Sequence, residues 1–212
     1  MGVYAVSEDF IRDLNEYFSK KYENYDLISS MPSYESVTIA MVLKNKNRIE
    51  EGEYTANEMR KISYQPNAEL VLSEIKQRYV DDNFSFSFRI APFGQRFRAF
   101  FGSGVTGKAL YSAIKKYGEE PESAYEKFGV SEKDWKKLLR GYYVPEKVLL
   151  FRIFLVLGMR SDDCAALMRI CGLSMNHEDA RDVVVNYLLD YRVFNREMID
   201  RAFEEFNIRK IL

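Results

Sequence analysis

Four positively charged side chains lie within a short stretch of this chain, and at this spacing they could bind phosphate groups. They are Lys133, Lys136, Lys137 and Arg140. On a helix, which turns by about 100° per residue, these positions fall on the arc opposite Trp135 and Leu138, which would face inward. Lysine and arginine donate hydrogen bonds to phosphate oxygens, and lysine can also donate to guanine acceptors in a DNA groove.

The residues around these cations predict two short helices joined by a tight turn. Gly129 stands just past the last apolar residue of a segment over 122–128, where glycine adopts the left-handed backbone at little cost. Ser131 can accept a backbone N–H from the first turn of the second helix, over 131–139, and Glu132 suits the positive end of that helix. A helix with a cationic outer face, held by such a turn, has the geometry that enters the major groove of DNA.

Acidic residues leave other interpretations of this face open. Residues 131–147 hold five cations and three anions, and Glu132 and Asp134 would repel phosphate if they face it. The same side chains could form an ordinary solvated helix face, or a surface for a protein partner or for RNA. The charge around the exposed face distinguishes these cases, since a positive face favours DNA.

A glycine-rich segment over 102–109 resembles a phosphate-binding loop in part. Its sequence, Gly-Ser-Gly-Val-Thr-Gly-Lys-Ala, matches G-x-x-x-x-G-K and lies between a predicted strand and a predicted helix. A loop of that class needs serine or threonine after the lysine to hold Mg²⁺, and Ala109 cannot ligate a metal. We therefore interpret the segment as a flexible joint between two domains.

The pattern of apolar residues differs on the two sides of that joint. Before it, the chain predicts helices over 7–25, 56–62 and 68–80, a buried strand over 34–44, and a hairpin of strands over 84–90 and 96–101. After it, every segment predicts a helix, over 108–117, 122–128, 131–139, 145–157, 162–171, 178–191 and 196–206. We expect an α+β fold, with a small α+β domain over 1–101 that contains the β-hairpin and an all-α domain over 102–212.

Phenylalanines in the predicted hairpin allow two interpretations. Phe84, Phe86 and Phe88 alternate with polar residues, which puts all three on one face of their strand. Packing of that face against helices is the simpler role. With Arg89 and Arg96 nearby, the same rings also have the composition of a stacking platform for single-stranded nucleic acid.

The helix pair has a recognisable order of residues: Gly129-Val130-Ser131 at the turn, the apolar residues Trp135 and Leu138 in the second helix, and Gly141 at its end. In this pattern, residues 103–212 resemble the helix-turn-helix module of phage repressors and Xre-type regulators. The apolar segment over 145–157 and the stretches over 158–173 and 183–189 resemble an extended form of that module, found at the C-terminus of Firmicutes proteins. The chain departs from the family at Tyr125, which replaces a small residue of the first helix and would separate the two helices or point outward.

This resemblance implies that outward residues early in the second helix contact DNA. They are Ser131, Glu132, Lys133, Lys136 and Lys137, with Arg140 reaching a phosphate. Regulators of this class bind paired half-sites as dimers, so a homodimer is expected. The resemblance implies no metal and no cofactor.

Composition and the remaining candidate residues favour a non-enzymatic cytoplasmic protein. The net charge is −1, so no overall basic field is present. The N-terminus lacks the apolar stretch of a signal peptide, and the apolar run over 148–159 is too short to span a bilayer. We expect Cys164 and Cys171 to be buried thiols and His177, the only histidine, to be exposed near a helix start. No catalytic or metal-binding arrangement can be built around that histidine.

Three functional hypotheses follow from the sequence. The leading one is a bacterial or phage regulatory protein that binds DNA through residues 102–212 and senses or docks through 1–101. The alternative is a non-enzymatic interaction protein in phage–host conflict, for example an inhibitor of a defence nuclease such as an anti-CRISPR protein. There the N-terminal domain would hold the target, and the helical domain would autoregulate transcription or act as a scaffold. The third is an enzyme whose site lies unrecognised in the N-terminal half.

Overall fold

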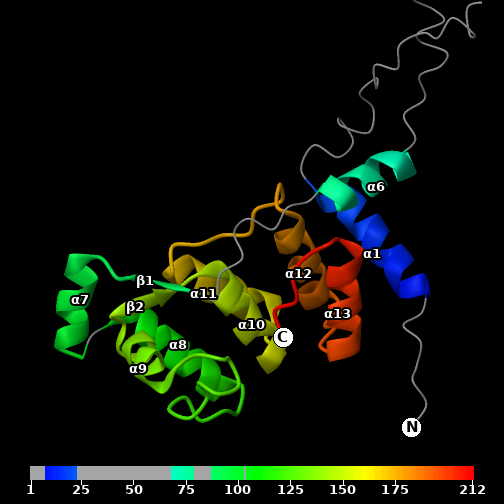
Figure 1. The fold of residues 1–212 in the computed structure, drawn as a ribbon. Helices are drawn as coiled ribbons and strands as arrows, with labels where there is room; N and C mark the ends of the chain where they lie inside the picture. Colours follow the sequence, from blue (N-terminus) through cyan, green and yellow to red (C-terminus); the bar gives the residue numbers. More distant parts are fainter. Residues whose placement is uncertain (1–7, 23–67, 79–86, 103) are drawn as a thin grey trace, which may run out of the picture. The chain divides into compact units, whose positions relative to one another are not determined.

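Helices make up most of the chain that the computed structural model describes, which is residues 8–22, 68–78, 87–102 and 104–212. The described elements, in chain order, are α1 (Glu8–Lys21), α6 (Ala68–Arg78), β1 (Phe88–Ile90), α7 (Phe93–Phe100), α8 (Val105–Lys116), α9 (Glu132–Arg140), β2 (Tyr143–Pro145), α10 (Lys147–Leu157), α11 (Ser161–Ile170), α12 (Ala180–Asp190) and α13 (Arg196–Glu205) (Figure 1). The two strands form one antiparallel sheet. The expected mixture of helix and sheet is confirmed in this coarse form. The strand expected over 34–44 and the helix expected over 56–62 lie outside the described residues.

The chain groups into two compact units that do not follow its order simply. One unit is formed by residues 1–22 together with 79–212, and the other by 23–78. α6 is the described helix of the second unit. The first unit holds segments from both sides of the boundary expected at residue 102, because β1 pairs with β2 and α1 packs against α12 and α13.

The core of the first unit is built around α10. Seven of its eleven residues are buried, as the sequence predicts for a central helix, and it packs against α11 and α12. The helix begins at Lys147, whereas Pro145, expected as its first residue, lies in β2. Lys147 Nζ donates to the buried carboxylate of Asp182 at 2.6 Å. Burial raises the pKa of that carboxyl, and the bond from Lys147 opposes the rise.

Two glycines bring α8 and α9 into backbone contact. Gly104 and Gly107 are both buried. A Cβ added to Gly107 would lie 2.6 Å from the amide nitrogen of Gly141 and closer still to the carbonyl oxygen of Leu139. The glycines that suggest a phosphate-binding loop or a flexible joint therefore act at these two positions as close-packing residues.

Trp135 fixes which face of α9 points inward. Its side chain is completely buried, its ring centroid lies 5.4 Å from that of Phe128, and its indole N–H donates to the carbonyl of Pro121 at 2.6 Å. The predicted phase of the helix is thereby confirmed. The helix predicted over 122–128 is wrong, because residues 121–129 form successive turns. A segment so short is not stable as a helix by itself, and the indole takes the carbonyl that would close its first helical turn.

The predicted hairpin over 84–101 is also wrong in its second strand. Residues 96–101 lie in α7 and the turn after it, and β1 pairs instead with β2, in a register that sets Phe88 opposite Pro145 and Ile90 opposite Tyr143. Pro92, which caps α7, has the fixed φ suited to a helix start. Phe88 is half-buried, and Phe84 and Phe86 lie outside the described residues.

Substitution of Gly107 by alanine should test the contact between α8 and α9. We expect Gly107→Ala to lower the free energy of unfolding by about 1–3 kcal/mol or more. The added methyl group would overlap the backbone at the end of α9, which can move only together with the rest of that helix. Gly94→Ala is the matched control, because Gly94 is also helical and a Cβ there meets nothing within 4 Å. It should be neutral or stabilise by up to about 1 kcal/mol. Chemical denaturation of both variants gives the comparison, and equal values would contradict the close-packing role.

Candidate nucleic-acid interface

The start and end of α9 are set by the residues that the sequence predicts. The Oγ of Ser131 accepts the backbone N–H of Asp134 at 3.2 Å and donates to the carboxylate of the same residue at 2.7 Å. Gly141 ends the helix in the left-handed conformation, with φ of +82°. These two caps fix the length of the helix, and the buried indole of Trp135 fixes its rotation.

The outer face of α9 forms one side of an open, positively charged hollow, here termed the basic depression. Its volume is about 540 Å³, and its lining residues are Ile90, Arg96, Lys133, Lys136, Lys137, Arg140, Tyr142 and Tyr143. None of these described lining residues is acidic. The structure thus brings together all four of the cations predicted on α9.

Arg96, Tyr142 and Tyr143 are lining residues that the sequence pattern does not assign to this face. Arg96 comes from α7, which follows β1. Tyr142 comes directly before β2, and Tyr143 is the first residue of that strand. The pairing of β1 with β2 spans more than fifty residues of sequence and brings the arginine to the depression. The signal for it in the sequence is weak, because each strand has only three residues.

Ser131 and Glu132, also predicted to contact DNA, do not line the depression. Ser131 is occupied as the helix cap. Glu132 pairs with Lys136 at 2.5 Å, and Asp134 lies 3.9 Å from Lys137. The four side chains of these two pairs are between 32% and 62% exposed, so the pairs are weak and a phosphate could displace the carboxylates.

Lys137 is held in place by Tyr143. The ammonium group donates to the Tyr143 hydroxyl at 2.9 Å and lies 4.8 Å from the centre of the same ring. That ring stacks in turn on Phe88, with centroids 4.7 Å apart and planes inclined by 17°. The bond to the hydroxyl is the main cause that raises the pKa of Lys137 above its ordinary value, so this cation is both charged and positioned.

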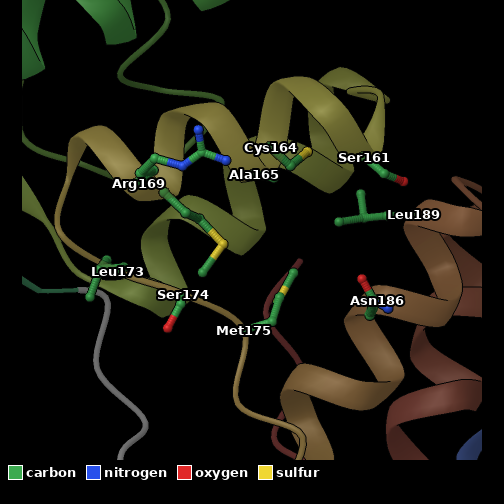
Figure 2. Close-up of a pocket in the computed structure, with 10 residues that line it drawn as sticks. Ser161, Cys164, Ala165, Arg169, Leu173, Ser174, Met175, Asn186 and Leu189 are labelled. Atoms are coloured by element: carbon green, nitrogen blue, oxygen red, sulfur yellow. The ribbon is translucent and has the colours of Figure 1, made fainter. Parts of the chain in front are cut away.

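A second, smaller pocket lies between α11 and α12 and has a volume of about 300 Å³. Figure 2 shows Cys164 and Ala165 on α11 opposite Asn186 and Leu189 on α12. Two of its polar groups already have partners, because Ser161 donates to Asp190 at 3.1 Å and Asn186 donates to the Tyr17 hydroxyl at 2.6 Å. Burial raises the pKa of Cys164 to about 12, so its thiol is protonated and is a poor nucleophile.

The two cysteines and the histidine lie as the sequence predicts. Cys164 and Cys171 are buried and unbridged, and His177 is exposed just before α12. Among the described residues, no group of three or more histidine, cysteine or acidic side chains is arranged to hold a metal ion. None of the described helices is long and apolar enough to cross a membrane.

Comparison with protein families, with curated proteins and with solved structures finds no match to this chain. The likeness to Xre-type regulators therefore depends on the sequence pattern of residues 103–212 alone. The turn before α9 departs from a regular helix-turn-helix, since residues 121–129 are not helical and Tyr125 is half-buried among them.

The hydrogen bond between Lys137 and Tyr143 should affect the titration of Lys137. In Tyr143→Phe, we expect the pKa of Lys137 to fall toward its ordinary value, because the ring remains but the accepting hydroxyl is lost. Since the bond raises this pKa, its contribution to stability is present below the ordinary lysine pKa of about 10.4 and is lost as pH rises through the raised value. NMR titration of the labelled lysine side chain measures the shift. Tyr142→Phe is the control, and an equal pKa in both variants would contradict the assignment.

Proposed function

We propose that this chain binds DNA through the basic depression and acts as a bacterial or phage regulatory protein. The observation that carries the proposal is the gathering of five cations from two separate segments around one hollow, with no acidic residue among those described as lining it. A chain with net charge of −1 has no general excess of cations to explain this. Their convergence points to an anionic partner.

The spacing of these cations suits a sugar–phosphate backbone. Lys133, Lys137 and Arg140 recur at intervals of four and three residues along α9, which sets them one turn apart on the same face. A helix in this position can follow successive phosphates and direct a lysine toward a base edge. Arg96 approaches the same hollow from α7 and would extend the contact beyond the helix.

Binding of this kind is expected to be strongly dependent on salt. Each phosphate contact releases condensed counterions, and the dependence of affinity on salt steepens by about 0.9 for every contact made. Two copies that read paired half-sites would double the contacts, and a homodimer is part of the proposal. An acidic protein partner would also satisfy these cations, and it is the alternative outcome of the experiment below.

Charge reversal on α9 tests the proposal directly. The protein is first used to select bound duplexes from a promoter-region library at low salt. We expect Lys136→Glu/Lys137→Glu to weaken binding of the selected duplex and to lower the salt slope by about 2, because two cations are removed from the depression. The free energy of unfolding should fall by about 2 kcal/mol at most, because the two exposed ion pairs are weak and one hydrogen bond, from Lys137 to Tyr143, is lost.

Lys20→Glu/Lys21→Glu is the matched control. It makes the same change of charge at adjacent exposed positions, near the end of α1 and outside the depression. The control should keep both the affinity and the salt slope of the unaltered protein. Equal loss of binding in both variants would contradict specific use of the depression. Failure to bind any duplex and any single strand of the same length would favour a protein partner.

A further inference from the structure

The helix beside the basic depression exposes an unusual amount of aromatic surface. Along α7 and the residue after it, the exposed fractions are 77% for Phe93, 59% for Phe97, 73% for Phe100 and 65% for Phe101. These four residues are termed the phenylalanine patch. Ala99 is the one residue of α7 that is buried. Contiguous apolar surface of this kind marks a site of contact with another molecule.

The phenylalanine patch and the basic depression are continuous. The guanidinium carbon of Arg96 lies 5.9 Å from the ring centre of Phe93, and Arg96 also lines the depression. Farther along the helix, the ring of Phe101 makes edge-to-face contacts with Phe97 and Phe100 at 5.1 and 5.3 Å. A ligand that fills the depression would therefore meet aromatic rings at its edge.

Charge and shape select among the molecules that could cover the patch. The sequence of α7 contains Arg96 and Arg98 and no carboxylate, so a second copy placed face to face would bring like charges together. A bilayer surface is too flat to bring its phosphates into a concave hollow of about 540 Å³. A strand of nucleic acid can do both, since its phosphates enter the hollow and its bases offer flat apolar faces.

We propose that the phenylalanine patch stacks on unpaired nucleobases while the neighbouring phosphates lie in the basic depression. The inference depends on the proposed binding of DNA and specifies its form, which is a single strand or a duplex opened beside α9. Stacking on aromatic side chains is tolerant of sequence and raises affinity by roughly 5- to 150-fold per base. Arg96 joins the two parts of the site, because it can contact a phosphate and lie over a ring.

Oligonucleotides with and without bases separate stacking from charge. The full chain is titrated with a fluorescent thymidine 20-mer, with an abasic 20-mer of equal charge, and with a duplex of the same length. We expect the thymidine strand to bind at least about tenfold more tightly than the abasic strand. Phe97→Ala/Phe100→Ala should remove most of that difference and leave the salt slope unchanged. Lys136→Glu/Lys137→Glu should weaken both strands and lower the slope.

Two control variants test whether the loss of binding is caused by the loss of the aromatic rings. Phe97→Trp should retain the preference for the strand with bases, because the ring is kept. Ile170→Ala should have no effect, because that side chain is 41% exposed on α11 and does not line the depression. The alanine variants remove exposed apolar surface, so loss of folding is not expected to obscure the result.

Each contrary outcome has a distinct meaning. Equal affinity for the thymidine and abasic strands, with tight binding to the duplex, would overturn stacking and leave the proposed function standing. Absence of binding to every nucleic acid would remove both proposals. Binding to anionic phospholipid vesicles in place of the strands would assign the patch to a membrane surface. Conversion of a dimer to a monomer in Phe97→Ala/Phe100→Ala, without loss of stacking preference, would assign the patch to self-association.

Discussion

The position of α9 depends on a backbone contact that only glycine permits. Gly104 and Gly107 let the start of α8 lie directly against the end of α9, and Gly141 provides the left-handed turn at the point of contact. α9 packs against α8 at one end and is fixed by the buried indole of Trp135. These two contacts determine the orientation of its cationic face. The chain then enters β2, which carries Tyr143 to the edge of the basic depression.

Cations in this chain are used in two different ways. Some half-buried cations satisfy backbone or buried acidic groups, as Arg152 does for the carbonyl of Phe128 and Lys147 does for Asp182. Several of those of the basic depression lie beside weakly paired carboxylates, a tyrosine hydroxyl or an aromatic ring. Breaking a buried pair would leave an uncompensated charge, whereas an exposed cation can exchange its partner for a ligand. Stability and binding therefore depend on different positive residues.

Local signals in the sequence were sufficient to predict α9 and its face. The spacing of Trp135 and Leu138, the capping serine and the final glycine act within a single helix, and the structure confirms each of them. Segments whose structure depends on distant residues were not predictable in this way. The alternation of residues 96–101 fits a strand, and the spacing of Phe93, Phe97 and Phe100 fits a helix equally well. Arg96 enters the candidate site only through the pairing of β1 with β2, which no local pattern specifies.

The concentration of cations in one hollow has a consequence for how the molecule moves toward a partner. The chain as a whole has 31 basic and 32 acidic residues, while the lining of the depression includes five of the former and none of the latter. Residues outside the depression are therefore acidic in sum, so the net charge of the chain does not describe the charge that a partner meets at the depression. In the field of a polyanion, a local group of cations steers the approach, so that productive encounters become more frequent without any change in the final contacts. This orienting effect reaches only about 10 Å at 0.1 M salt, and cells of higher ionic strength would shorten it further.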